Sequence, residues 1–364
     1  MTTTAAMLAA RTGLRTGARV STCLVCQWRT FSTTGYQRLP TDHTPGAAAP
    51  DGKPKPRQTF APAPVAATEP APDSPLAHAP RSYGKKVKDF TPTPLSRPIG
   101  MNTPPAAGQN TGIDHRTFKQ RRDDFVDYER HLAKREYLKN KVSRPYFRDW
   151  VNLSFHKGKT FLAPPRLFKA DLSLYFPNLF GRTLASRQKA DTTPLLAGHA
   201  SVVTVFSGMW AENQIKTFVS PEQNPALHQV LKESGGRAQL VQINVEEDWM
   251  KMMLIKLFSW SLRNKVGKEN WHRYFLVRKG ITDEIRESVG LLNSKVGYTY
   301  LMDHRCRIRW AGSGSAEGDE REGLVKGVRR LLEEIKAEGV TGGVAEGHVL
   351  KPLAAGKPTT GDKK

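Results

Sequence analysis

The stretch from Ala200 to Val219 constrains the fold of this chain more than any other part of the sequence. Ala200–Phe206 is a continuous apolar and β-branched run, which predicts a strand that is covered on both faces of a sheet. A short loop, Ser207–Trp210, and a helix over Ala211–Val219 follow directly. Strand, tight loop and helix in this order predict the opening unit of a domain in which strands and helices alternate.

The alternation continues as far as residue 337. The predicted elements are, in order, helix Leu227–Glu233, strand Gln239–Val245, helix Trp249–Arg263, strand Arg273–Val277, helix Thr282–Leu291, a hairpin of Tyr298–Met302 and Arg305–Trp310, and helix Glu320–Ala337. Such alternation implies parallel crossovers, and the final hairpin adds an antiparallel edge. This order is similar to that of the thioredoxin-like fold in its peroxiredoxin-type form, so the predicted fold class is α/β.

Both marks of redox chemistry in that fold are missing. Redox members place a cysteine at the helix N-terminus, because the helix dipole lowers the pKa of the thiol. Here Gly208, Met209, Trp210 and Ala211 hold those positions. The second mark is a cis-proline opposite the loop, whereas Gly297 stands before the predicted strand at Tyr298. We therefore predict that the chain is not an enzyme.

No other catalytic or cofactor-binding set replaces these marks. The histidines are scattered without metal-ligand spacing, and no phosphate-binding loop, nucleophile elbow or dinucleotide fingerprint is present. The acids Glu246, Glu247 and Asp248 are predicted to cap a helix rather than to hold a metal. Cys306 is predicted to be a small residue in a strand, and a redox protein that uses it stays open as an alternative. We predict no cofactor, metal or small-molecule substrate.

The N-terminus has the composition of a mitochondrial transit peptide. Residues 1–41 contain no Asp or Glu, and arginine recurs among Ser, Thr and Ala. The run Arg29-Thr-Phe31-Ser32 resembles a processing site with arginine at position minus three, so residues 1–31 are predicted to be removed after Phe31. The Cys23–Cys26 pair lies within this segment.

The chain is strongly basic, with a net charge of +22. Removing the four arginines of the transit peptide leaves about +18. This charge suits an anionic membrane surface, an acidic protein or a nucleic acid. A basic protein associated with the mitochondrial ribosome or RNA is therefore an alternative function. Against it, the basic residues are interleaved with acids, so we expect no nucleic-acid partner.

The remaining organisation is read from composition. A Pro/Ala-rich linker is predicted to be disordered because proline removes amide donors and favours extended chain. The predicted segments are a linker at 32–113, a charged helical segment at 114–149, an aromatic and Pro-rich wrap segment at 150–198, the thioredoxin-like domain at 199–338 and a disordered tail at 339–364.

Two segments contain more apolar residues than a segment needs to pack one of its sides against a core. The wrap segment either packs on the neighbouring domain or forms a groove for a hydrophobic partner. The apolar residues of helix Trp249–Arg263 cover roughly two-thirds of its circumference. That helix is either buried or presents a Met-rich surface to lipid or to a hydrophobic client protein. The candidate client-binding residues are Phe161, Pro164, Pro165, Phe168, Tyr175, Phe176, Pro177, Asn178, Leu179, Met250, Met253 and Trp260.

Over about Phe125–Leu332 the chain resembles the mitochondrial ATP synthase assembly factor ten family, chaperones of the membrane-embedded Fo sector. Tyr175-Phe-Pro-Asn-Leu179, with Pro164, Pro165 and Phe168, is the most specific part of the resemblance. The resemblance implies peripheral attachment to the matrix face of the inner membrane. It also implies binding of newly made subunit a (subunit 6) before that subunit joins the c ring. No catalytic residues are carried over.

Overall fold

A computed structural model describes most of the chain from residue 74 to residue 339. The described residues are 74–83, 87–114, 116–142, 147–186 and 188–339. The predicted transit peptide with Arg29, Phe31 and Ser32, the first part of the predicted linker, and the tail from residue 340 lie outside the described residues. Those features stay predictions.

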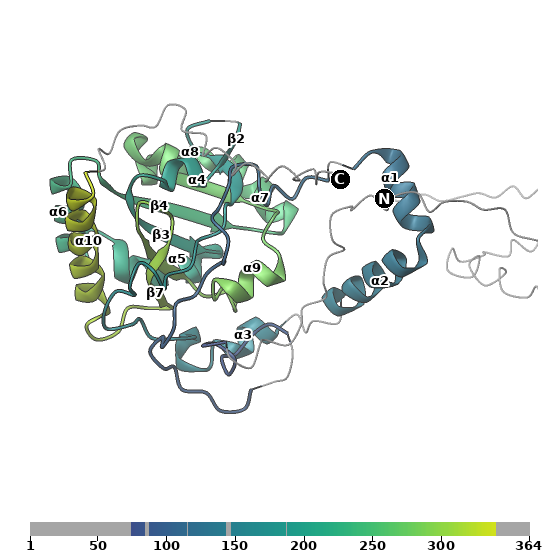
Figure 1. Cartoon of the computed structure of the whole chain (residues 1–364), viewed down its shortest axis with the longest axis horizontal. Coiled ribbons are helices and arrows are strands. Elements are labelled where there is room, and N and C mark those ends of the chain that lie inside the picture. Colours follow the sequence, from purple (N-terminus) through teal and green to yellow (C-terminus); the bar gives the residue numbers. More distant parts are fainter. Residues whose placement is uncertain (1–73, 84–86, 115, 143–146, 187, 340–364) are drawn as a thin grey trace, which may run out of the picture. The chain divides into compact units, whose positions relative to one another are not determined.

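A seven-stranded mixed sheet in the order β2-β1-β5-β4-β3-β6-β7 forms the centre of the domain (Figure 1). β3 pairs in parallel with β4, and β4 with β5, whereas the other neighbours are antiparallel. The strands are β1 (Phe180–Thr183), β2 (Lys189–Asp191), β3 (Ala200–Phe206), β4 (Ala238–Val245), β5 (Tyr274–Val277), β6 (Tyr298–Met302) and β7 (Ile308–Ser313).

Helices connect the strands in the predicted order. They are α1 (Phe118–Val126), α2 (Tyr128–Val142), α3 (Arg148–Asn152), α4 (Thr193–Leu196), α5 (Gly208–Val219), α6 (Pro225–Glu233), α7 (Trp249–Leu257), α8 (Ser259–Val266), α9 (Asp283–Ser288) and α10 (Glu320–Ala337), with 3-10 helices η2 (His156–Gly158) and η3 (Lys268–Arg273). The parallel β3-α5-α6-β4 crossover and the β6–β7 hairpin followed by α10 confirm the thioredoxin-like α/β fold.

Local sequence signals account for the ends of several elements. All seven residues of β3 are buried, as the unbroken apolar run predicts. The Thr282 side chain accepts a hydrogen bond from the Ile285 N–H and so caps α9 as predicted. The Asp248 side chain caps α7 through the Met250 N–H at 2.9 Å, which agrees with a capping role for the acids before that helix.

Three predictions about local structure are wrong. The predicted loop Ser207–Trp210 is mostly helical, because α5 begins at Gly208 directly after the N-cap Ser207. Trp249–Arg263 forms two helices rather than one, because the chain leaves helical geometry at Phe258 (φ −88°, ψ 14°). Cys306 lies in the turn between β6 and β7 with φ 62°, not in a strand. Strands β1 and β2 were not predicted. They extend the sheet beyond β5 although each has only a few residues.

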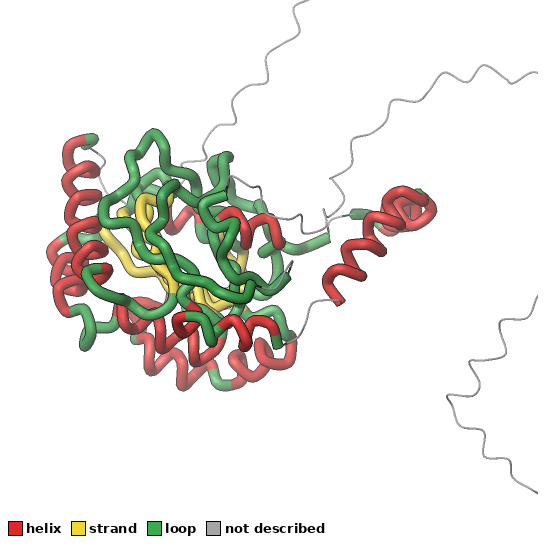
Figure 2. The backbone as a smooth tube through the Cα atoms, turned by 90° about the horizontal axis from the view of Figure 1, so that it is seen from below, coloured by secondary structure: helices red, strands yellow, loops and turns green. Residues whose placement is uncertain are grey.

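The two faces of the sheet are covered differently. Side chains of α5, α6 and α10 pack on one face around Val202, Leu301 and Trp310. Further along that face, α7 and α8 pack on the β5 residues through Met252 and partly buried neighbours. The opposite face is covered mainly by irregular chain together with α9. Figure 2 shows loop segments that cross the strands.

This irregular cover comes from two segments, and one of them corrects the prediction of a disordered linker. Leu76, Leu95 and Ile99 are no more than 5% exposed and belong to the main core. Met101 pairs with Tyr175 through backbone hydrogen bonds of 2.7 and 2.8 Å. Proline prevents regular structure here but not burial, since an extended chain can lay its apolar side chains on a sheet that another segment provides. The prediction of disorder is therefore wrong for residues 74–83 and 87–113.

Candidate functional site

The parallel strands β3, β4 and β5 end at one edge of the sheet, where open α/β sheets commonly bind their ligands. α5 begins there directly after β3, and Gly208 adopts φ 76°, a left-handed conformation that favours glycine. α7 begins there after β4. A contact of 3.5 Å between Ser207 Oγ and Glu246 Oε2 joins the two loops. This edge is the place at which a redox member of the fold would carry its cysteine.

Large apolar side chains at the start of α5 and along α7 and α8, the helices that begin at or follow from this edge, are open to solvent. Each is 48–76% exposed. We call them the carboxyl-edge surface: Met209, Trp210, Trp249, Met250, Met253, Leu254, Leu257, Phe258 and Trp260. An apolar surface of this extent is typical of a site that binds a protein or a membrane.

α7 and α8, which carry most of this surface, contact the rest of the domain through only a few side chains. Met252 is 3% exposed and packs with Ala211 and Ile215 of α5. The Arg263 side chain donates to the carbonyl oxygen of Leu184 at 2.9 Å. Only a small part of the apolar surface of α7 is used in this attachment. The structure thus favours the exposed-surface interpretation of Trp249–Arg263 over burial.

The position opposite the loop is closed to a proline. The Gly297 N–H donates to Gln214 Oε1 at 2.9 Å, a bond that proline cannot make. A Cβ atom at Gly297 would lie 2.5 Å from Ile215 Cγ2 and 2.6 Å from the carbonyl oxygen of Ala211. Where redox members of this fold have a cis-proline, this chain therefore has a glycine that packs closely against α5.

Cys306 does not supply a reactive thiol at this edge. It follows β6, whose last residue, Met302, pairs with Ser201 at the start of β3, so it lies at the opposite edge of the sheet. Its side chain is 3% exposed. Burial, with a smaller contribution from Asp303, raises the pKa of Cys306 to about 12. Near neutral pH the thiol stays protonated and is a poor nucleophile.

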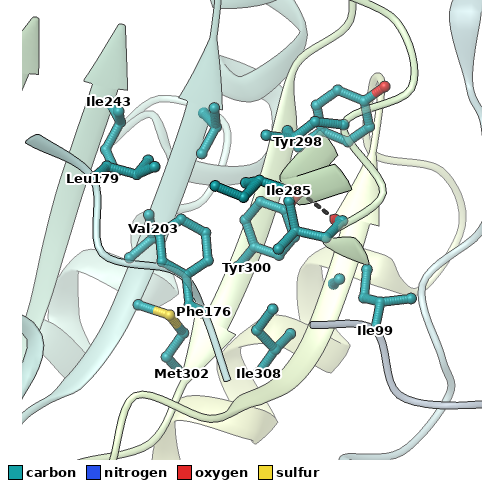
Figure 3. Packing of buried hydrophobic residues seen from close by; sticks show 14 of the residues in the cluster. Ile99, Phe176, Leu179, Val203, Ile243, Ile285, Tyr298, Tyr300, Met302 and Ile308 are labelled. Atoms are coloured by element: carbon teal, nitrogen blue, oxygen red, sulfur yellow. Dashed lines mark hydrogen bonds between the residues drawn. The ribbon is translucent and has the colours of Figure 1, made fainter. Parts of the chain in front are cut away.

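Most of the wrap residues predicted to bind a client are part of the core. Phe161, Phe176 and Leu179 are 1% exposed and Asn178 is fully buried. Pro164 and Pro177 are also buried, Phe168 and Tyr175 are half-buried, and Pro165 is exposed. Figure 3 shows the labelled side chains of this packing, among them Ile99, Phe176, Leu179, Val203, Tyr300 and Met302. The prediction that the buried wrap side chains face a client is wrong, because they pack on the sheet face opposite α5, α6 and α10.

Asn178 joins separate segments through its side chain. Its Nδ2 donates to the Gln109 carbonyl oxygen at 2.9 Å and to Asp191 Oδ1 at 2.6 Å. Its Oδ1 accepts from the N–H and the hydroxyl of Thr193 at 3.1 and 2.9 Å. The side chain thus ties Gln109 and the end of β2 to the start of α4.

We expect Asn178→Ala to lower the free energy of unfolding by about 2–4 kcal/mol, because several buried polar groups would lose their partner. Urea denaturation measures this loss. Gln188→Ala, at an exposed amide between β1 and β2, is the control and is expected to change stability by less than about 0.5 kcal/mol. Equal stability of the two variants would contradict the structural role of Asn178.

The predicted residues Met250, Met253 and Trp260 do lie in the carboxyl-edge surface. Their role in binding a client stays a prediction. Sequence analysis missed the other members as site residues. For the members on α7 and α8, the signal was the excess of apolar residues around Trp249–Trp260, which a buried helix would also show. Among the described residues, no helix is both long and apolar enough to cross a bilayer.

Comparisons with known proteins match most of the chain. Residues 81–331 match the family model described as ATP10 protein. The mitochondrial ATPase complex subunit ATP10 of Eremothecium gossypii is 31% identical over 245 residues, which cover 67% of this chain and 86% of that protein. The subunit of the same name from Saccharomyces cerevisiae is 28% identical, with 67% and 88% covered. A solved secreted thiol-disulfide isomerase from Corynebacterium glutamicum is 10% identical, with a TM-score of 0.33 over 48% of this chain and 99% of that chain.

Proposed function

The chain belongs to the ATP10 protein family, and from that membership we propose that it is a non-enzymatic assembly factor of mitochondrial ATP synthase. In this proposal it holds newly made subunit a (subunit 6) of the Fo sector and promotes its incorporation with the c ring. It acts at the matrix face of the inner membrane, to which it attaches peripherally.

The carboxyl-edge surface is the observation that carries this proposal. A membrane subunit exposes large apolar areas until it is assembled, and water disfavours them. Methionine and aromatic side chains suit such a client, because methionine adapts its shape and aromatic rings offer large contact areas. Here Met250, Met253, Trp249 and Trp260 present both kinds of side chain to solvent.

The same edge supports a role in holding rather than in catalysis. Met209 and Trp210 occupy the start of α5 and are 76% and 51% exposed. Where a redox protein of this fold would attack a disulfide, this chain offers apolar contact area. The thiol of Cys306 is buried at the other edge. We accordingly propose that the fold uses the carboxyl-edge surface to hold another protein and does not supply a nucleophile at this edge.

A photoreactive phenylalanine analogue at position 257 tests the proposal. Leu257 is 71% exposed in the carboxyl-edge surface. In mitochondria that are synthesising Fo subunits, we expect light to crosslink this position to subunit a. The control places the same analogue at Glu333, an exposed residue of α10, where no such product is expected.

Two results would contradict the proposal. One is the failure of position 257 to capture any Fo membrane subunit, or equal capture from position 333. The other is recovery of the protein with ribosomal RNA and its release by salt, which would favour the RNA-associated alternative.

A further inference from the structure

A cavity of about 430 Å³ lies between α7 and the strands β2, β1 and β5 at one side of the sheet. Five cationic side chains line it: Arg182, Lys189, Lys256, Arg278 and Lys279. No acidic side chain is among the described residues that form its wall. No ion pair with a described acid is found for these five cations either. The cavity is therefore an electropositive site of a size that suits a small anionic group.

The strand register forces two of these charges together. Arg182 of β1 and Lys189 of β2 are directly opposite in an antiparallel pair. Like charges in this position destabilise a sheet. The Lys189 ammonium lies 5.3 Å from the centre of the Phe180 ring, which provides it with a favourable contact on one side only. A bound anion would offset the remaining repulsion.

The cavity is continuous with the carboxyl-edge surface. Trp249 and Met253 line the cavity and also belong to that surface. A soluble phosphate compound would use only the cations. An acidic phospholipid would use both parts, since its headgroup is anionic and its acyl chains are apolar. Tryptophan at the border between the two parts matches its preference for the membrane–water interface.

We propose that this basic cavity binds the phosphate headgroup of an acidic phospholipid, with Trp249 facing the acyl region. Basic side chains close to an anionic membrane attract it, and this attraction falls off within a Debye length. The proposal rests on the proposed peripheral position at the inner membrane but not on the identity of the client protein. It gives the protein a fixed orientation, with the carboxyl edge of the sheet towards the lipid.

Vesicle flotation with the full chain tests this inference. The vesicles consist of phosphatidylcholine with or without phosphatidylglycerol, and the altered protein carries Arg182→Gln with Lys189→Gln. We expect the unaltered chain to prefer phosphatidylglycerol vesicles and the double variant to lose about tenfold or more of that affinity. The control removes the same charge from α10 by Arg329→Gln with Lys336→Gln, both exposed residues, and is expected to stay within about twofold. The melting temperature of the cavity variant should not fall, because opposed like charges are removed.

Several outcomes would overturn the inference. Equal binding of the unaltered chain to both kinds of vesicle would remove any acidic-lipid site. Equal losses in the cavity and control variants would indicate diffuse attraction by net charge. Binding of glycerol 3-phosphate or inorganic phosphate to the chain, without any preference of the chain for phosphatidylglycerol vesicles, would assign the cavity to a soluble phosphate compound. If the double variant binds vesicles normally but loses crosslinking from position 257, the cavity binds an acidic part of the client instead.

If the double variant loses vesicle binding but keeps crosslinking from position 257, the result supports the lipid site and leaves the client-holding function intact.

Discussion

Replacing Lys159 with methionine is expected to lower the free energy of unfolding by about 3–5 kcal/mol, because it leaves a buried carboxylate without its cation. The Lys159 side chain is 1% exposed, and its Nζ lies 2.8 Å from Glu320 Oε2. Nζ also donates to the carbonyl oxygens of Ser313 and Ser315 at 3.1 and 2.7 Å. One side chain thus joins the wrap segment to β7 and α10.

The control for this prediction is an ion pair of the same type on the surface. Lys326 Nζ and Glu322 Oε2 are 3.3 Å apart, but their side chains are 76% and 71% exposed. Lys326→Met is therefore expected to change stability by less than about 1 kcal/mol in the same urea titration. Adding Glu320→Leu to Lys159→Met should recover part of the loss, since no buried charge remains. Equal, small losses for Lys159→Met and Lys326→Met would refute the role given to Lys159.

Replacing Met253, Leu257 and Trp260 together with glutamine is expected to reduce capture of subunit a at least about tenfold without lowering stability. These side chains are 53%, 71% and 74% exposed. Each loses about 1 kcal/mol or more of apolar contact with a bound client, and about 1.4 kcal/mol corresponds to tenfold in affinity. Exposed positions contribute little to folding, so the melting temperature should stay near its original value. Co-purification of subunit a from mitochondria measures the capture.

A matched variant separates this surface from exposed apolar residues in general. Leu172 is 65% exposed but lies in the wrap segment, outside the carboxyl-edge surface. Leu172→Gln should leave capture unchanged. The triple variant would disprove the assignment of the client site if it captured subunit a normally while it remained folded. A large fall in its melting temperature would show instead that α7 and α8 are core elements.

Local patterns were sufficient for most elements of the thioredoxin-like domain. β3 and α10 begin and end at the predicted residues. An unbroken apolar run and an amphipathic repeat each specify their own secondary structure. β1 and β2 escaped prediction because each is short, and its hydrogen bonds depend on partners elsewhere in the chain. Strands that form through pairing with distant segments show little strand pattern in their own sequence.

The candidate site was predicted in part, for a related reason. Hydrophobic content identified both the wrap segment and Trp249–Arg263 as unusual, but it could not assign one to the core and the other to solvent. Phe176 is 1% exposed and Trp260 is 74% exposed, although both are aromatic residues in apolar segments. Exposure depends on which surface is still uncovered when a segment packs, and other segments decide that.

The sequence by itself determined the strand Ala200–Phe206 and the helix that follows it, the order of the later elements, and the lack of a thiol at the start of α5. These are properties of residue type and local periodicity. Only the tertiary structure decided that residues 74–101 and the wrap segment cover one face of the sheet. The tertiary structure also decided that the apolar side chains of α7 and α8 are exposed to solvent and that Arg182 lies opposite Lys189. The physical reason is that burial and charge proximity arise between segments distant in the chain, and no single segment encodes them.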